Sequence, residues 1–196
     1  RYGSINTMRP MFAKFIYHKY KATRVLDFTA GWGARMLGAM AMDIDYIGVD
    51  SNKSLKSGYE RLIKAVAPYS SSKVRMIFKR AENVNYSGMK YDFVFTSPPY
   101  EDLEKYEGMP QYEDFYQNFL IPTMVKVFAG LPKGKTMCIN MPEKMYKEVK
   151  KRFGKATSRT KYYKQQRVGK VKGKDIAELY RTRGYAFELV YCWLKR

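Results

Sequence analysis

One short run of this sequence, Ser97-Pro98-Pro99-Tyr100, combines groups that could hold an amine for reaction. Proline has no backbone N–H and keeps the chain extended, so the carbonyls of Ser97 and Pro98 stay free as acceptors. The Ser97 hydroxyl and a free carbonyl can together accept both hydrogens of an –NH₂ group, and the ring of Tyr100 can stack on the ring that carries the amine. The alternative is an ordinary turn that ends a strand.

A second run, Asp27-Phe28-Thr29-Ala30-Gly31-Trp32-Gly33, has the character of a nucleotide-binding loop. It lies between a short apolar stretch and a run of helix formers. Its glycines allow a tight turn and the close approach of a ligand, and the following helix offers free N–H groups. It is not a phosphate-binding P-loop, because no Gly-Lys-Ser/Thr follows.

An acidic residue, Asp50, ends the next predicted strand. An acid about 20 residues beyond such a loop suits hydrogen bonding to both hydroxyls of a ribose. The alternative is a cap for the next helix. The loop and Asp50 together indicate an adenosine-type cofactor, and they do not choose between NAD and S-adenosylmethionine.

With Ser97-Pro98-Pro99-Tyr100 following a strand, the sequence resembles the S-adenosylmethionine-dependent amino-methyltransferases of DNA, whose signature is Asp/Asn/Ser-Pro-Pro-Tyr/Phe/Trp. The Ser form is typical of, though not exclusive to, the enzymes that methylate cytosine at N4. Thr7-Met8-Arg9-Pro10 is similar to the Thr-x-Lys/Arg-Pro motif that precedes the cofactor loop in a large subset of the family. The likeness covers about residues 5–145.

The resemblance implies a role for each matching residue. Ser97, Pro98, Pro99 and Tyr100 would be the catalytic set. Thr7 and Arg9 would contact the amino-acid end of the cofactor, where an arginine suits the carboxylate. Glu82 would face the adenine, the alternative being a surface glutamate. The predicted cofactor-binding set is Thr7, Arg9, Asp27, Thr29, Ala30, Gly31, Gly33, Asp50, Ser51, Glu82 and Ser97.

The sequence departs from the family pattern in two ways. The usual first loop is Asp-Pro-Phe-x-Gly-x-Gly, but here Phe28 and Thr29 replace Pro and Phe, and Trp32 fills a usually small position. An indole folded into the pocket would exclude the cofactor. The chain also has no room for a separate target-recognition domain, so only a basic region, 147–185, is available for that task.

The elements that must position these residues alternate along the chain. Strands separated by helices predict an α/β fold, and the resemblance implies a doubly wound, Rossmann-like class I methyltransferase sheet, mostly parallel with an antiparallel C-terminal strand. Ligands bind outside the carboxyl ends of such strands. Strands are predicted at 24–29, 45–50, 74–79, 91–97, 136–141 and 186–194, and helices at 11–21, 34–42, 53–66 (with Ser51 as a plausible N-cap) and 113–129, the last kinked or broken at Pro122.

The charge of the chain predicts a polyanionic partner. Lys and Arg number 37 against 18 Asp and Glu, a formal net charge of +19. As that partner, nucleic acid is favoured over an acidic membrane surface. The alternative is that the positive charge serves only to keep the protein soluble. Residues 150–174 contain no acid and are predicted to form a long basic loop or small subdomain inserted before the last strand. The residues expected to bind nucleic acid are Lys151, Arg152, Lys155, Arg159, Lys161, Tyr162, Tyr163, Lys164, Arg167 and Lys170.

Length and composition exclude several other classes. The 196 residues predict a single domain, 1–196, and a 45% hydrophobic content excludes general disorder. No apolar run would span a bilayer, and no secretory signal starts the chain. Two isolated cysteines, Cys138 and Cys192, fit a reducing compartment, hence a cytoplasmic, nucleoid or nuclear location. No metal-ligand cluster is expected, and the lone His18 is expected on a helix surface.

The predicted function is methyl transfer from S-adenosylmethionine to the exocyclic amine of a base in DNA, with cytosine N4 preferred. Methylation at cytosine C5 is excluded, because no proline is followed by the cysteine nucleophile of that chemistry. Three alternatives stay open: methylation of adenine N6, methylation of RNA, and a catalytically silent nucleic-acid-binding subunit with the same fold.

Overall fold

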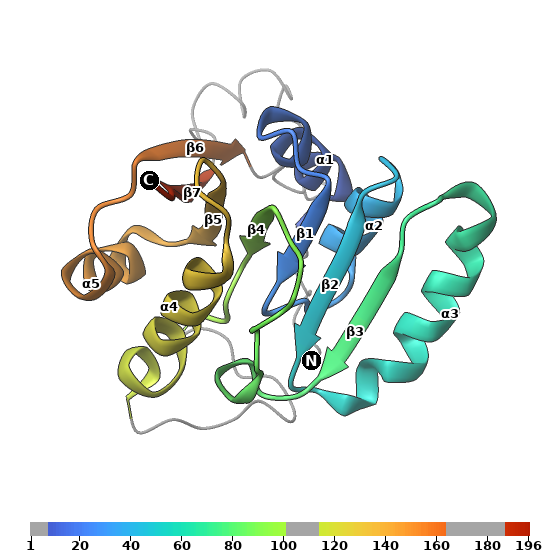
Figure 1. Ribbon diagram of the computed structural model, residues 1–196, viewed down its shortest axis with the longest axis horizontal. Coiled ribbons are helices and arrows are strands. Elements are labelled where there is room, and N and C mark those ends of the chain that lie inside the picture. Colours follow the sequence, from blue (N-terminus) through green and yellow to red (C-terminus); the bar gives the residue numbers. More distant parts are fainter. Residues whose placement is uncertain (1–7, 101–113, 164–186) are drawn as a thin grey trace, which may run out of the picture.

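The computed structural model describes residues 8–100, 114–163 and 187–196. Within them, seven strands form one sheet in the order β3-β2-β1-β4-β5-β7-β6 (Figure 1). Strands β1 to β5 are parallel, β7 runs antiparallel to β5, and β6 runs antiparallel to β7. The predicted α/β fold is confirmed, with one more antiparallel strand than expected. The strands are β1 (Arg24–Asp27), β2 (Asp45–Asp50), β3 (Val74–Phe78), β4 (Phe93–Thr96), β5 (Thr136–Met141), β6 (Ser158–Tyr163) and β7 (Phe187–Leu194).

Helices cover both faces of this sheet (Figure 1). The sheet therefore separates two hydrophobic layers, one on each face. One layer is closed by α1 (Pro10–Lys19), α2 (Ala34–Met40) and α3 (Lys56–Val66). The other is closed by α4 (Ile121–Gly130) and α5 (Glu143–Phe153). Because β4 and β5 are buried on both sides, every residue of these strands is buried. Apolar runs such as 93–95 are typical of parallel strands covered in this way.

The helix predicted at 113–129 is interrupted, as its proline suggested. A π-helical turn, Tyr116–Leu120, leads into α4, and Pro122 lies in the first turn of α4. A proline is tolerated there because the first N–H groups of a helix have no intrahelical partner. The Thr123 hydroxyl donates a hydrogen bond of 2.7 Å to the Phe119 carbonyl. Shorter 3₁₀ turns cover Lys53–Leu55, Ala67–Tyr69 and Ala81–Asn83, and Asn52, rather than the predicted Ser51, caps the first of them.

The basic stretch 150–174 was expected to be a loop or small subdomain, and its described part corrects that prediction. Helix α5 continues to Phe153, and Ser158–Tyr163 forms the edge strand β6 of the main sheet. The strand forms because it pairs with β7, which is distant in sequence, and the Thr157 N–H and the Cys192 carbonyl start that pairing at 2.8 Å. Residues 164–174 lie outside the described residues.

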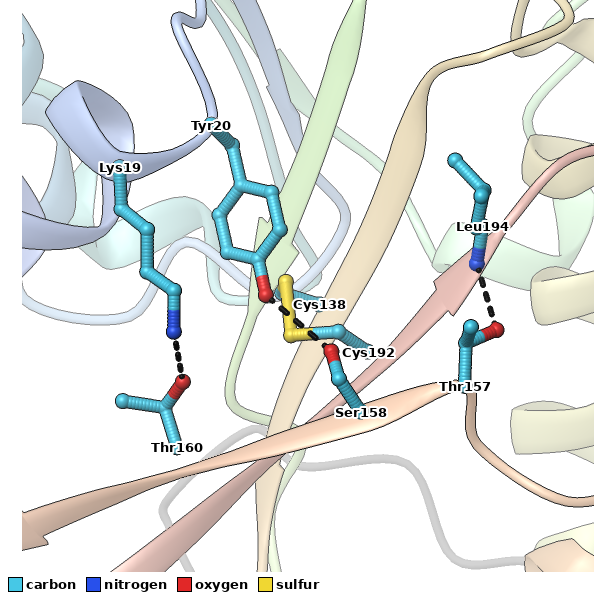
Figure 2. Close-up of a disulfide and its surroundings, with 8 residues drawn as sticks. All are labelled: Lys19, Tyr20, Cys138, Thr157, Ser158, Thr160, Cys192 and Leu194. Atoms are coloured by element: carbon cyan, nitrogen blue, oxygen red, sulfur yellow. Dashed lines mark hydrogen bonds between the residues drawn. A yellow bond between two sulfur atoms is a disulfide. The ribbon is translucent and has the colours of Figure 1, made fainter.

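The cysteines are not isolated, contrary to the sequence-based expectation. Cys138 on β5 lies directly opposite Cys192 on β7, and the two form a disulfide (Figure 2). The register of an antiparallel pair decides this contact, so spacing along the chain gives no sign of it. Disulfides are uncommon in reducing compartments, so the cysteines no longer support the predicted location.

The end of α1 is tied to the edge strand beside this disulfide. The Lys19 ammonium donates a hydrogen bond of 2.8 Å to the Thr160 hydroxyl, and the Tyr20 and Ser158 hydroxyls lie 3.4 Å apart (Figure 2). Alternation along β6 therefore turns Ser158 and Thr160 toward α1, and Arg159 toward the layer that α5 covers. Strand β6 thus contacts α1, near the start of the chain, and pairs with β7, near its end.

Two helical glycines predict opposite effects on stability. A Cβ at Gly38 on α2 would lie 2.7 Å from the Ala13 Cβ and 2.8 Å from the Pro10 carbonyl oxygen. A Cβ at Gly58 on α3 would meet nothing within 4 Å. We expect Gly38→Ala to lower the free energy of unfolding by about 1–3 kcal/mol through overpacking of α1 on α2. Gly58→Ala should raise it by about 0.5–1 kcal/mol through helix propensity.

Urea denaturation followed by circular dichroism measures both changes. Equal effects of the two substitutions would show that the close approach of α1 and α2 is not a constraint on the fold.

Candidate active site

The candidate site lies where the order of the parallel strands reverses. Strands β1 and β4 are neighbours, β2 and β3 follow on one side, and β5 follows on the other. The connection after β1 leads to the layer of α2, and the chain after β4 reaches the layer of α4. Connections that diverge in this way open a crevice at the carboxyl ends of the strands. Asp27, Asp50 and Ser97 lie at those ends, as predicted.

Asp27 at the end of β1 is completely buried and lies at the centre of a polar network. One carboxylate oxygen accepts hydrogen bonds of 2.6 Å from Arg35 Nε and 2.6 Å from the Tyr46 hydroxyl. The other accepts from the Thr96 hydroxyl at 2.8 Å and from the Thr29 N–H at 3.2 Å. Both oxygens are occupied and neither is exposed, so this carboxylate joins the surrounding elements, and a cofactor contact at Asp27 stays a prediction.

Arg35, in the first turn of α2, was not singled out from the sequence. Burial opposes its charge, but the adjacent Asp27 carboxylate raises the pKa of its guanidinium above the usual value, so the two groups form a buried ion pair. The guanidinium also donates to the Thr29 carbonyl, and the Arg35 carbonyl accepts from the Tyr17 hydroxyl of α1 at 3.0 Å. Burial and the nearby Asp27 raise the pKa of Tyr17 and of Tyr46, so both act as neutral donors.

The glycine loop after β1 is held by internal hydrogen bonds. The Ala30 N–H donates to the Val49 carbonyl at 2.8 Å, and the Gly31 N–H donates to the Asp50 carboxylate at 2.7 Å. The Tyr59 hydroxyl donates to the Gly31 carbonyl at 2.9 Å. Gly31 and Gly33 have φ angles of +60° and +83°, which disfavour other residues. The loop therefore has a fixed shape, and the N–H groups of Ala30 and Gly31 are already used within the protein.

Asp50 joins β2 to that loop and is only partly buried. Each of its carboxylate oxygens accepts one backbone N–H, from Gly31 at 2.7 Å and from Asn52 at 2.8 Å. Burial raises the pKa of this carboxyl, and the two N–H donors lower it in part. Asp50 does not cap the next helical turn, whose N-cap is Asn52, and each of its carboxylate oxygens keeps a lone pair for a further donor.

The remaining predicted cofactor residues are placed as follows. Trp32 is 54% exposed, so its indole is not part of the core. Arg9 is exposed immediately before α1, and Ser51 and Glu82 are half-buried just beyond the ends of β2 and β3. Thr7 lies outside the described residues.

The diproline run follows β4 without a break. Pro98 is buried, and Ser97, Pro99 and Tyr100 are half-buried, with Tyr100 packed against the core layer under α4 and α5. The Ser97 hydroxyl donates a hydrogen bond of 3.2 Å to the side chain of Asn140 at the end of β5. Asn140 was missed in the sequence, although a polar residue near the end of an otherwise apolar strand is a recognisable signal.

Only some of the predicted nucleic-acid-binding residues are described. Lys151 and Arg152 form ion pairs of 2.8 Å and 2.6 Å with Glu148, one turn earlier on α5. Lys155, Arg159 and Lys161 are exposed. The backbone of 162–163 belongs to β6, and Lys164, Arg167 and Lys170 lie outside the described residues.

Across 8–100, 114–163 and 187–196, no helix has the length and apolar character needed to cross a membrane. The same ranges hold no cluster of three or more His, Cys, Asp or Glu side chains suited to a metal ion.

The Asp27 network predicts an unequal response to the loss of two arginines. Arg35→Ala should lower the free energy of unfolding by about 3–5 kcal/mol, because it leaves a buried carboxylate without its counter-charge. The control is Arg24→Ala at the opposite end of β1, where Arg24 Nε and Asp45 Oδ2 lie 3.4 Å apart and the two side chains are 41% and 27% exposed. That change should cost about 0–1 kcal/mol.

Chemical denaturation of both variants gives the comparison. Losses of similar size would show that Arg35 does not neutralise Asp27 in the folded protein.

Known proteins are similar to this chain in fold. No protein-family model matches the chain, and no curated protein matches it. Among solved structures, an rRNA methylase from Streptococcus thermophilus has a TM-score of 0.61 at 10% identity, covering 98% of this chain and 100% of that one. A precorrin-6y C5,15-methyltransferase from Geobacter metallireducens has a TM-score of 0.61 at 9% identity, covering 97% and 92%.

A third similar structure is longer than this chain. The Thermus thermophilus 16S rRNA guanosine-N2 methyltransferase, solved with S-adenosylmethionine and guanosine, has a TM-score of 0.60 at 15% identity, and the match covers 100% of this chain and 45% of that one. At such low identities, these likenesses show that this chain shares the Rossmann-like fold of methyltransferases.

Proposed function

We propose that this protein transfers a methyl group from S-adenosylmethionine to the exocyclic amine of a nucleobase. The observation that carries the proposal is the position of Ser97-Pro98-Pro99-Tyr100 at the end of β4. There it lies next to β1 in the sheet, at the crevice where such folds bind ligands.

The chain's own groups fit an adenosyl cofactor in this crevice. The Asp50 carboxylate has a lone pair on each oxygen for the ribose hydroxyls, Arg9 is exposed for the carboxylate, and Glu82 lies beyond β3 for the adenine. When bound, S-adenosylmethionine would supply an electrophilic methyl group on its sulfonium sulfur.

The diproline run would prepare the target amine for attack. An exocyclic amine is a poor nucleophile, because its lone pair is delocalised into the ring. Accepting its two N–H groups at Ser97 Oγ and at the Pro98 carbonyl favours a pyramidal nitrogen with the lone pair directed outward. Within 8–100, 114–163 and 187–196, no hydrogen bond to the Pro98 carbonyl is found.

The transfer itself needs no covalent enzyme intermediate. The amine nitrogen forms the new N–C bond as the C–S bond breaks in line, the electron pair of that bond stays on sulfur, and the surplus amine proton leaves to solvent. The protein contributes positioning and electrostatics, and a water-poor crevice strengthens both.

The preferred substrate is cytosine N4 in DNA, on the basis of the Ser form of the motif. A base in a duplex cannot reach a crevice at the strand ends, so the base must flip out or the strand must be single. Tyr100 would stack on the extruded ring, a contact worth about 1–3 kcal/mol. The exposed Lys155, Arg159 and Lys161 would bind phosphates and make affinity fall with salt.

RNA is the second candidate substrate. The specific observation in its favour is that rRNA methylases are among the similar structures. The same acceptor pair suits a base amine in either nucleic acid, so the motif alone does not exclude it.

The deciding experiment is tritiated methyl transfer from S-adenosylmethionine to unmodified DNA and RNA, with nucleoside mass spectrometry of the products. N4-methylcytosine in DNA supports the preferred substrate, and N6-methyladenine or a methylated RNA base supports an alternative. Cofactor binding without any methylated product would identify a silent subunit and overturn the proposal.

Two substitutions in the diproline run predict a separation of chemistry from cofactor binding. Ser97→Ala should lower the methyl-transfer rate about 10²-fold, because one of the two acceptors for the amine is lost. Tyr100→Ala should also lower it strongly through the lost stacking. Calorimetric affinity for S-adenosylhomocysteine should stay close to wild type in both. Near-normal turnover in both variants would remove this run from the active site.

The partly buried Asp50 carboxyl leads us to expect a cofactor affinity that depends on pH. Asp50→Asn should weaken binding about 10- to 100-fold, because the ribose loses a charged acceptor. Burial raises the pKa of Asp50, so protonation of the wild-type carboxyl begins at a higher pH than for an ordinary aspartate. Wild-type affinity should therefore fall on acidification, and the variant's weaker affinity should lack this fall.

The control is Asp45→Asn at the opposite end of the same strand, where the carboxylate accepts the Lys73 N–H at 2.9 Å. It should bind cofactor like the wild type across the same pH range. If Asp50→Asn does so as well, Asp50 is not part of the cofactor site.

A further inference from the structure

Asn140 is a buried polar residue beside the proposed catalytic serine that the mechanism above does not use. It is 2% exposed and lies near the end of β5. Thr96 on β4 pairs with Ile139 on β5, so Ser97 and Asn140 are the next residues along the two parallel strands. The contact between their side chains is thus fixed by the register of the sheet.

The surroundings of Asn140 decide which way its amide points. One end of the amide lies 3.2 Å from the backbone carbonyl of Leu189 on β7. A carbonyl only accepts hydrogen bonds, so this end must be the Nδ2 donor. The other end, Oδ1, only accepts, and it lies 3.2 Å from Ser97 Oγ. The Ser97 hydroxyl must therefore donate its hydrogen bond to Asn140 Oδ1.

A hydroxyl whose proton is committed presents only lone pairs to its other neighbours. An amine that enters the crevice then meets Ser97 Oγ as an acceptor, which is the role that an –NH₂ group requires. A freely rotating hydroxyl would point its proton at the amine for part of the time. A hydroxyl that donates to the lone pair of the amine nitrogen would hinder the attack of that nitrogen on a methyl group.

We infer that Asn140 is a positioning residue, which uses the Leu189 carbonyl of the antiparallel strand β7 to hold the Ser97 hydroxyl as a hydrogen-bond acceptor for the target amine. This inference rests on the proposed function. Because the amide is neutral, Asn140 orients the serine proton and does not remove it. The proton stays on Ser97 throughout the transfer.

A double-mutant cycle of Ser97 and Asn140 tests the inference. Asn140→Ala should lower the methyl-transfer rate at saturating cofactor about 10-fold, as expected for the loss of one orienting hydrogen bond. Its calorimetric affinity for S-adenosylhomocysteine should match the wild type. In the Ser97→Ala background, Asn140→Ala should cause no further loss, because the hydroxyl it orients is absent.

A full 10-fold further loss in the double variant would show that Asn140 acts on the fold or on the cofactor, and would overturn the inference. An unchanged rate in Asn140→Ala would overturn it as well. A wild-type protein that methylates no nucleic acid would overturn the proposed function itself, so the two failures are distinct.

A second variant keeps the test valid if Asn140→Ala does not fold. In Asn140→Asp, the protonated carboxyl can donate to the Leu189 carbonyl and accept from Ser97, whereas the carboxylate would repel that carbonyl. The rate of this variant relative to wild type should therefore rise as the pH falls through the pKa of the new carboxyl. A ratio that is constant with pH would contradict an orienting role.

Discussion

The buried ion pair between Asp27 and Arg35 is the interaction on which the candidate site depends. A carboxylate with no exposed surface is costly unless it is paired and hydrogen-bonded, and here five donor contacts share that task. Its partners come from the glycine loop, α2, β2 and β4, and Arg35 in turn accepts from Tyr17 of α1. One charge pair therefore fixes the loop, the neighbouring strands and two helices relative to each other, which is the rigidity that a crevice for two reactants needs.

The antiparallel end of the sheet completes the other half of the site. Strand β7 pairs with β5 and so brings the Leu189 carbonyl to Asn140 and Cys192 to Cys138. In a wholly parallel sheet ending at β5, Asn140 would lack a buried acceptor for its amide. Strand β6 then adds a charged edge, on which Arg159 and Lys161 are exposed while Thr160 contacts Lys19 of α1. Charged edge strands also oppose unwanted pairing with other chains.

The charge of the molecule is less uniform than the sequence suggests. Lys151 and Arg152 both pair with Glu148, so part of the positive charge at the end of α5 is already neutralised within the protein. Exposed ion pairs contribute about 0–1 kcal/mol each to stability. Lys155, in the turn after α5, and Arg159, on β6, are exposed and are better candidates for a nucleic-acid-binding surface than Lys151 and Arg152.

The sequence by itself determined the α/β class, the placement of most strands and the position of Asp50 and Ser97 at strand ends. It could do so because strand runs, glycine turns and prolines act locally: the Pro98-Pro99 pair ends a strand wherever it occurs. Only the tertiary structure decided that Asp27 is a buried counter-charge, that Asn140 holds Ser97, that 158–163 is a strand and that Cys138 meets Cys192. Each of these depends on a partner that lies far away in the chain and is brought near by strand register, and no local pattern of residues records that register.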